Sequence, residues 1–451
     1  MRNLQLKTPP MGWNSFDCFD GSINEEHALK NLEVFIEKFK PAGYEYFVID
    51  IAWYRKILDP KPNQYGLLQR KWKIGNIDWE LDEWGRFIPS KQCFPNGFEP
   101  IIKRCHEAGV KFGLHLMRGV PQKAADEKYP IKGTNGITAD QIVNRDPEDR
   151  CEWSNICYGI DMAKPGAQEY YDSVIEQMAQ MGVDYLKYDD IEGSQEEMEA
   201  VYRAIDKVDR TITLSLSLFS YSYMKRQIPL SVYAKSNMMR ITHDIWDKQS
   251  HIESSFDAWM QRSLQDNERP EWFFFDLDMI PFGHLRLNYG ETADEEFTDT
   301  FNEEGEHWCH FTPEQMRTFM TQRAMMGSPL FMGGNLPDND ELTDSILLNP
   351  YMIECDQNGV VGHPVTHKGD LHVFRTMGKN DAEGYGWIGI FNRGDSQLDA
   401  EVTLADMGLI PTKAYDFFDV WNRMPVETHA GLLSVSLSAH DVLFVKYQMN
   451  K

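Results

Sequence analysis

Residues 165–189, PGAQEYYDSVIEQMAQMGVDYLKYD, contain one complete repeat of a helix followed by a strand. Pro165 suits the first turn of a helix, Gly182 suits its end, and an apolar run then leads to Asp189. Comparable apolar runs recur along the chain, and helical stretches separate most of them. Counted from the start of the chain, the runs are 11–16, 46–51, 111–117, 183–189, 211–218, 239–244, 272–280 and 329–332.

Eight such runs predict an α/β fold with a closed (β/α)8 TIM barrel. Strands joined by helices run parallel, and eight repeats favour a closed barrel over an open sheet. From about residue 360 the pattern changes to alternating runs separated by turns, without clear helices. These later runs are 371–375, 386–392, 401–404 and 442–447. We expect a catalytic barrel over residues 1–355 and a C-terminal antiparallel β-sandwich domain over residues 356–451.

Two local patterns predict where helices begin. Ser22-Ile23-Asn24-Glu25 has the form of a capping box, and the helix that it opens is expected to run to about Lys40. Thr312-Pro313-Glu314-Gln315 has the same form. In both cases a side-chain oxygen is expected to accept from a backbone N–H in the first helical turn.

Composition and charge exclude several classes of protein. Hydrophobic residues make up 42% of the 451 residues and charged residues 25%, as in an ordinary soluble globular protein. The net charge of −25 argues against nucleic acid and against anionic membranes, because both attract basic proteins. The chain has no apolar stretch long enough to span a bilayer, and its start, MRNLQLKTPPMGWN, lacks the apolar core of a signal peptide. We expect neither nucleic acid nor membrane as a partner.

The seven cysteines form an odd set without a CxxC pair. This pattern predicts free thiols in a reducing compartment, hence a cytoplasmic protein, although a signal peptide removed from the mature chain stays an open alternative. The pattern nearest to a metal cluster is His307-Trp308-Cys309-His310, beside an acidic stretch. The sequence predicts no metal and no cofactor.

Two of the strand-like runs end on carboxylates. Asp189 follows Lys187, and Asp244 follows Arg240, at spacings that put each pair on one face of a strand. Catalytic groups of a βα barrel stand at the carboxyl ends of its strands. A glycosidase uses two carboxylates that converge at such a position. They lie about 5 to 5.5 Å apart in a retaining enzyme and roughly 6.5 to 9.5 Å apart in an inverting one. A Schiff base on Lys187, as in an aldolase, is the competing barrel chemistry.

Several motifs, in the same order along the chain, resemble those of the family 27 glycoside hydrolases, which are α-galactosidases and α-N-acetylgalactosaminidases. The resemblance covers residues 8 to about 360, and the β-rich tail also fits the family. The matching motifs are Pro9-Pro10-Met11-Gly12-Trp13-Asn14-Ser15, 42–46 leading to Asp50, Gly85-Arg86, Phe94-Pro95-Asn96-Gly97, 183–189, Arg240-Ile241-Thr242-His243-Asp244, Asp276-Leu277-Asp278-Met279 and Ser328-Pro329-Leu330-Phe331-Met332.

The resemblance implies a metal-free, retaining double displacement on a small-molecule or oligosaccharide substrate. Asp189 would be the nucleophile and Asp244 the acid/base. Asp50, Lys187, Arg240 and Asp278 match sugar-binding positions. The other candidate substrate-binding residues are Phe16, Trp53, His115, Ser217, Ser220 and Tyr221.

Three departures from the family pattern concern the sugar. Ile51 stands where the family usually has a second aspartate that grips hydroxyls on the C4/C6 side, His115 stands for a common Tyr, and Phe16 for a common Trp. Small residues after the fifth strand are similar to the version of the family that leaves space for a 2-acetamido group. We expect an exo-acting α-galactosidase or α-N-acetylgalactosaminidase. The alternatives are an enzyme for another sugar such as a β-L-arabinopyranoside, or a glycan-binding protein without hydrolysis. Homo-oligomers occur in the family, and a homo-oligomer stays open here.

Overall fold

The computed structural model describes residues 6–68, 77–146, 149, 151, 154, 156–191, 194–218, 228–288, 305–380, 384–429 and 431–450. Its largest sheet has eight parallel strands in the order β11-β10-β9-β8-β5-β2-β1-β14. The sheet curls into a barrel that closes where the Ile280 N–H donates to the carbonyl oxygen of Phe331 (2.8 Å). The strands are β1 (Met11–Asn14), β2 (Tyr46–Ile49), β5 (Lys111–Met117), β8 (Tyr185–Asp189), β9 (Thr213–Ser217), β10 (Met238–Arg240), β11 (Phe274–Asp276) and β14 (Leu330–Met332). Each predicted run overlaps one of them, so the prediction of a TIM barrel is confirmed.

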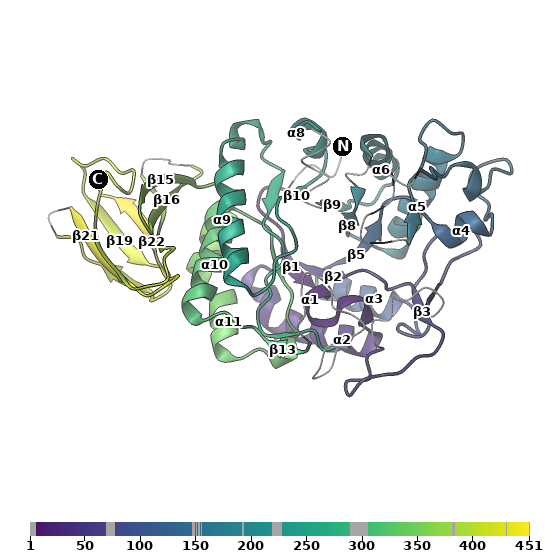
Figure 1. Ribbon diagram of the computed structural model, residues 1–451, viewed down its shortest axis with the longest axis horizontal. Helices are drawn as coiled ribbons and strands as arrows, with labels where there is room; N and C mark the ends of the chain where they lie inside the picture. Colours follow the sequence, from purple (N-terminus) through teal and green to yellow (C-terminus); the bar gives the residue numbers. More distant parts are fainter. Residues whose placement is uncertain are drawn as a thin grey trace.

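Helices surround the barrel (Figure 1). The longer ones are α2 (Glu25–Val34), α3 (Glu99–Glu107), α5 (Ala167–Met181), α6 (Gln195–Lys207), α9 (Gln249–Ser263) and α10 (Pro313–Met326). The shorter ones are α1 (Phe16–Phe19), α4 (Gln122–Asp126), α8 (Leu230–Tyr233), α11 (Glu341–Leu347) and α12 (Pro350–Gln357). Helix α5 ends at Gly182, whose φ of 97° is the left-handed conformation that glycine adopts without strain.

One of the two predicted helix starts is confirmed and the other is wrong. The Thr312 side chain accepts from the Gln315 N–H and the Gln315 side chain accepts from the Thr312 N–H, which is the predicted capping box of α10. At α2 the cap is Asn24, whose side-chain oxygen accepts from the His27 N–H (3.0 Å). Asn24 has extended backbone angles, so the helix begins two residues later than the Ser22 pattern predicts.

The barrel interior changes from apolar to polar toward the carboxyl ends of the strands. Residues two apart on a strand share a face, so Tyr185, Lys187 and Asp189 lie in line along β8. On β10 and β11 the same step leads from an apolar residue to Arg240 and Asp276. A cluster of buried apolar side chains fills the deeper layer: Tyr46, Val48, Tyr185, Met238, Phe274, Met279 and Phe331. This apolar layer closes the barrel below and leaves the charged groups at its open end.

The C-terminal part is an antiparallel β-sandwich, as predicted. A six-stranded sheet, β15-β16-β17-β22-β19-β20, faces a two-stranded sheet, β18-β21, across an apolar core. The strands are β15 (His363–Lys368), β16 (Leu371–Met377), β17 (Tyr385–Asn392), β18 (Leu398–Thr403), β19 (Tyr415–Asp419), β20 (Met424–Val426), β21 (Leu432–Leu437) and β22 (Val442–Met449).

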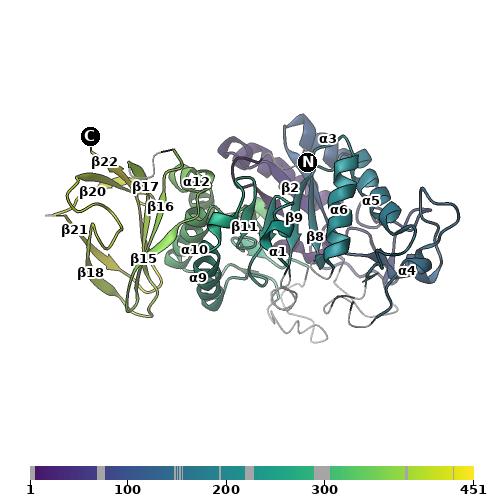
Figure 2. The same cartoon turned by 90° about the horizontal axis from the view of Figure 1, so that it is seen from above.

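The sandwich lies at one end of the molecule, next to α9, α10 and α12 (Figures 1 and 2). Trp259 of α9 stacks on Phe374 of β16, with ring centroids 4.1 Å apart, and donates its indole N–H to the carbonyl oxygen of Gly362 (2.8 Å). Both rings belong to the same buried apolar cluster as the barrel. The six-stranded sheet therefore packs one face on the barrel helices and the other on the small sheet.

Besides β18-β21, the described residues form three short two-stranded antiparallel sheets: β3 (Arg55–Ile57) with β4 (Ile77–Trp79), β6 (Val120–Pro121) with β7 (Cys157–Tyr158), and β12 (His284–Leu285) with β13 (His307–Trp308). All seven cysteines are free thiols, as predicted. Among the described residues, none of the helices combines the length and the apolar character needed to cross a bilayer.

Candidate active site

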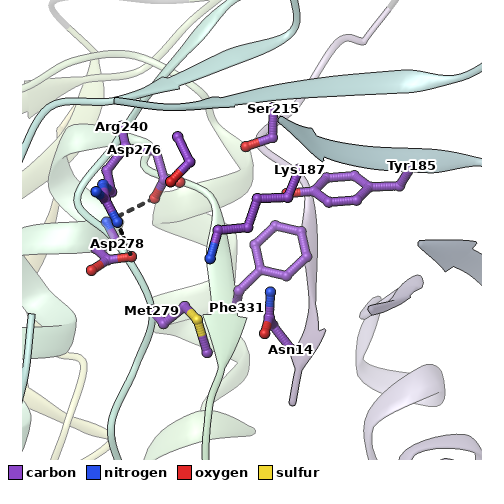
Figure 3. Close-up of a pocket in the computed structure, with 10 residues that line it drawn as sticks. Asn14, Tyr185, Lys187, Ser215, Arg240, Asp276, Asp278, Met279 and Phe331 are labelled. Carbon is purple, nitrogen blue, oxygen red and sulfur yellow. Dashed lines mark hydrogen bonds and ion pairs between the residues drawn. The ribbon is translucent and has the colours of Figure 1, made fainter. Parts of the chain in front are cut away.

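A cavity opens at the carboxyl ends of the barrel strands, with about 330 Å³ of space not filled by atoms, part of which is open solvent. Side chains from six barrel strands and from the loop after β11 converge on it (Figure 3). Its walls mix cations, carboxylates and hydroxyls with a few apolar groups, which is the composition expected for a polar ligand such as a sugar. The lining residues are Asn14, Tyr185, Lys187, Ser215, Ser217, Arg240, Asp276, Asp278, Met279 and Phe331.

Asp189, the last residue of β8, is held by two donors. The imidazole Nε2 of His115 lies 3.1 Å from one carboxylate oxygen, and the Asp190 N–H donates to the other (2.9 Å). Burial raises the pKa of Asp189, but the hydrogen bond and charge of His115, with the charges of Arg240 and Lys187, outweigh burial and lower it below its usual value. Asp189 is therefore ionised at neutral pH, as a nucleophile must be.

Lys187 pairs with Asp50, which immediately follows β2. The ammonium donates to an Asp50 carboxylate oxygen (3.0 Å), and the Asn14 amide donates to the same oxygen (2.7 Å). Burial raises the pKa of Asp50, but Lys187 and His115 overcome that effect and hold the pKa at about 2. The charge of Asp50 likewise raises the pKa of Lys187 above its usual value, against the opposing effect of burial. A lysine held protonated is a poor amine nucleophile, which argues against the Schiff-base alternative.

Asp244 lies four residues beyond Arg240, and the two form an ion pair (2.7 Å). The Arg240 guanidinium also donates twice to the carbonyl oxygen of Leu218, at 3.1 and 2.9 Å, so its direction is set by the residue that follows β9. The Asp244 side chain keeps 51% of its surface exposed at the mouth of the site. Loss of surrounding water still raises its pKa, and the negative charges of Asp278 and Asp189 add to this effect while Arg240 opposes it. Two carboxylates with pKa values shifted in opposite directions are the arrangement of a nucleophile and an acid.

Asp278 is aligned by the backbone around it. Its φ of 71° is left-handed, a conformation that Asp tolerates better than most residues. One carboxylate oxygen accepts from the Ile245 N–H (2.8 Å), and the other lies 3.9 Å from Arg240. Asp278 thereby connects the loop of Asp244 to the cavity.

The remaining predicted residues have different surroundings. Phe16 lies beside the Lys187 ammonium, 5.6 Å from the ring centroid, and Ser217 lines the cavity. Trp53 is 1% exposed in the main core, where its indole donates to the carbonyl oxygen of His115 (2.9 Å). Trp53 therefore contacts the His115 backbone from the core and is not among the residues that line the cavity. The last two, Ser220 and Tyr221, lie outside the described residues.

Sequence reasoning missed several members of the site. Asn14 orients Asp50, and the Ser15 hydroxyl accepts from the Asp50 N–H (2.9 Å). Both belong to the motif at residues 9–15, so their position at the end of the first strand was a usable signal. Asp276 also belongs to one of the matching motifs, Asp276-Leu277-Asp278-Met279, and ends a strand, but it was not among the predicted site residues. Burial raises its pKa to about 7, which makes it a carboxyl that changes protonation near neutrality.

Comparison with known proteins adds to this geometry. A family model described as alpha galactosidase A matches residues 153–297. The crystal structure of a family 27 β-L-arabinopyranosidase from Geobacillus stearothermophilus has a TM-score of 0.86 and 32% identity, over 99% of this chain and 98% of that one. A putative α-N-acetylgalactosaminidase from Bacillus halodurans gives 0.79 and 31%, over 98% and 97%. The α-galactosidase of Coffea arabica is 24% identical over 96% of this chain and 92% of its own length.

Proposed function

Because the chain belongs to glycoside hydrolase family 27, we propose that it is a retaining exo-glycosidase for terminal galacto-configured pyranosides, α-galactosides or α-N-acetylgalactosaminides. The observation that supports this most directly is the pair of opposed carboxylates: Asp189 held ionised by His115 and Asp244 with a raised pKa beside Arg240. Relatives named for both activities span nearly the whole chain.

In the first step the Asp189 carboxylate attacks the anomeric carbon while Asp244 donates its proton to the departing glycosidic oxygen. A glycosyl ester forms on Asp189 with inverted configuration. In the second step Asp244, now ionised, takes a proton from a water molecule that attacks the same carbon. The ester bond breaks, Asp189 returns as a carboxylate, and two inversions restore the original α configuration.

The rest of the site binds the sugar. Asp50 is a buried acceptor whose own charge is balanced by Lys187, so the pair offers both a carboxylate and an ammonium to hydroxyl groups. Asp278 and Arg240, 3.9 Å apart, make a second such pair in the cavity lining. Charge-assisted hydrogen bonds of this kind give roughly twice the strength of neutral ones, and they also fix the direction of a hydroxyl.

The stereochemistry of the product tests the proposal. During cleavage of p-nitrophenyl α-D-galactopyranoside, proton NMR of the first-formed sugar should show the α anomer before mutarotation produces the β anomer. First appearance of the β anomer would instead mean a single displacement, and Asp189 would then be a base rather than a nucleophile.

Ile51 favours a second candidate, a β-L-arabinopyranoside. This sugar has the galacto arrangement of hydroxyls but lacks the hydroxymethyl group. Ile51 has a hydrocarbon side chain with no donor or acceptor for a 6-hydroxyl, and it is 4% exposed in the main apolar core. The relative from Geobacillus stearothermophilus is named for this activity.

Ile51→Asp should shift preference toward the hexoside. We expect the ratio of kcat/KM for p-nitrophenyl α-D-galactopyranoside over the β-L-arabinopyranoside to rise roughly 10- to 100-fold, because a hydrogen bond to a charged group contributes about 1.5–3 kcal/mol. Ile51→Asn is the matched control, similar in shape without the charge, and should give a smaller change. An unchanged ratio in a variant with wild-type Tm would contradict a role for residue 51 in sugar choice.

A further inference from the structure

Two histidines and one aspartate meet outside the catalytic cavity. Asp247 lies three residues beyond Asp244, His307 is the first residue of β13, and His310 lies between β13 and α10. The His307 Nε2 is 3.3 and 3.4 Å from the two Asp247 oxygens, and the His310 Nδ1 is 3.1 Å from the nearer one. One ligand atom from each of the three residues can be chosen so that all three atoms lie within 4.8 Å of one another.

The nitrogen-to-oxygen distances match those between two ligands of one metal ion. Zinc binds imidazole nitrogen and carboxylate oxygen at about 2.0–2.2 Å, and at the tetrahedral angle two such ligands lie about 3.3 Å apart. The observed nitrogen-to-oxygen separations of 3.1–3.4 Å agree with that value. Two imidazoles and a carboxylate leave a fourth position for water, and His310, with 51% of its side chain exposed, places that position at the surface.

The hydrogen bonds of His307 prepare its ring for a cation. Its Nδ1 lies 2.7 Å from the carbonyl oxygen of Gly305, and only an N–H can pair with a carbonyl oxygen. The lone pair of a neutral ring is then on Nε2, the atom that faces Asp247. Histidine ligands of metals have this same outer hydrogen bond, which fixes the tautomer.

The surroundings make a cation between the three residues favourable. The Asp247 side chain is 1% exposed and that of His307 is 10% exposed. The two imidazoles stack nearly parallel, at 6° with centroids 4.7 Å apart. The Nε2 of His307 and the Nδ1 of His310 both face the buried Asp247 carboxylate, which also accepts the His310 backbone N–H (2.8 Å). One divalent ion bound to these three atoms would balance the charge of the buried carboxylate while both rings stay neutral.

We propose that Asp247, His307 and His310 bind one divalent transition-metal ion, of which zinc is the best fit. The ion connects the loop after β10, which carries Asp244, to β13 and the start of α10. Its role is structural, because the hydrolysis derived above uses no metal. The site goes beyond the proposed function, and its test does not depend on sugar turnover.

The test measures zinc binding to the full chain, prepared without an affinity tag and treated with EDTA. We expect calorimetry with ZnCl2 to show one tight site and Tm to rise with zinc. His310→Ala changes a surface residue and should weaken zinc binding at least about 100-fold. Loss of an outer-shell partner typically weakens metal binding by about 10- to 100-fold, and loss of a direct ligand should have a larger effect. His367→Ala is the matched control. It removes one ring of another stacked histidine pair, His367 and His372, in the sandwich and should leave zinc binding unchanged.

Cobalt substitution identifies the ligands. Co²⁺ should give the visible absorption of a tetrahedral site without a thiolate charge-transfer band, because no cysteine is among the three ligands. The proposal is overturned by any of three results: no zinc-dependent heat or Tm change in the wild type, equal binding by His310→Ala, or an equal loss in His367→Ala. A thiolate band would place the metal on cysteines and would overturn it as well.

Discussion

We expect Asp189→Ala to lower kcat/KM for aryl α-galactosides by at least about 10⁴-fold, since Asp189 is the proposed covalent nucleophile and removal of such a group is among the costliest single changes in an enzyme. The loss should fall on kcat, because the ester intermediate no longer forms. Azide added to this variant occupies the space of the carboxylate and attacks the anomeric carbon once. We expect the product to be β-galactosyl azide, identified by NMR.

Two further variants separate chemistry from folding. Asp189→Asn keeps the size of the buried side chain and should be equally inactive with a Tm near that of the wild type. Asp184→Asn changes a carboxylate at the other end of the same strand, where it pairs with Arg210 and His106, and should retain activity. A rate within about tenfold of wild type in Asp189→Ala would remove Asp189 from the mechanism.

The loss of activity in Asp244→Ala should depend on the leaving group of the substrate. Cleavage of an alkyl galactoside needs a proton on the departing oxygen, so kcat/KM should fall by about 10²- to 10⁴-fold. A dinitrophenyl galactoside leaves without help, so its first step should remain fast and the ester should accumulate as a burst. Azide should now give the α-configured galactosyl azide, because Asp189 still performs the first displacement. Equal losses on both substrates would contradict the acid role.

The pH profile follows from the same two groups. The wild-type kcat/KM should rise as Asp189 ionises, at a pH below the usual aspartate range because its pKa is lowered. It should fall as Asp244 loses its proton, at a higher pH because that pKa is raised. Asp244→Ala should lose the falling limb on the activated substrate and keep the rising one. A falling limb that persists would assign it to another group, and the buried Asp276, with its pKa of about 7, is the first to examine.

The sequence predicted the barrel because strand and helix periodicity is local. Each of the eight apolar runs overlaps a strand, and the capping box at Thr312 begins α10 as expected. Motifs at strand ends also placed Asp189, Lys187, Arg240 and Asp278 around one opening, because parallel strands in a barrel end at the same face. The predicted N-cap of α2, Ser22, is two residues before the observed one, Asn24. Both residues are good caps, and the turn before Glu25 decides between them.

Contacts between residues far apart in the chain could not be predicted from the sequence. Lys187 is two residues from Asp189, yet its hydrogen bond goes to Asp50, 137 positions away. Trp53 is a candidate substrate-binding residue in the sequence, but in the fold it is buried in the core and its indole N–H donates to the carbonyl oxygen of His115. The predicted division of the chain between residues 355 and 356 stays a prediction, and it falls inside α12.

The sequence by itself determined the order of strands and helices, the family and the identity of the charged residues at the strand ends. Only the tertiary structure decided which of those charges meet. The metal cluster shows why: the His307–His310 pattern lacks a third ligand until β10 and β13 bring Asp247 to it from 60 positions away. The sequence specifies the chemistry of each side chain. The distances between these side chains, on which an acid, a nucleophile or a metal site depends, are set only when the barrel closes.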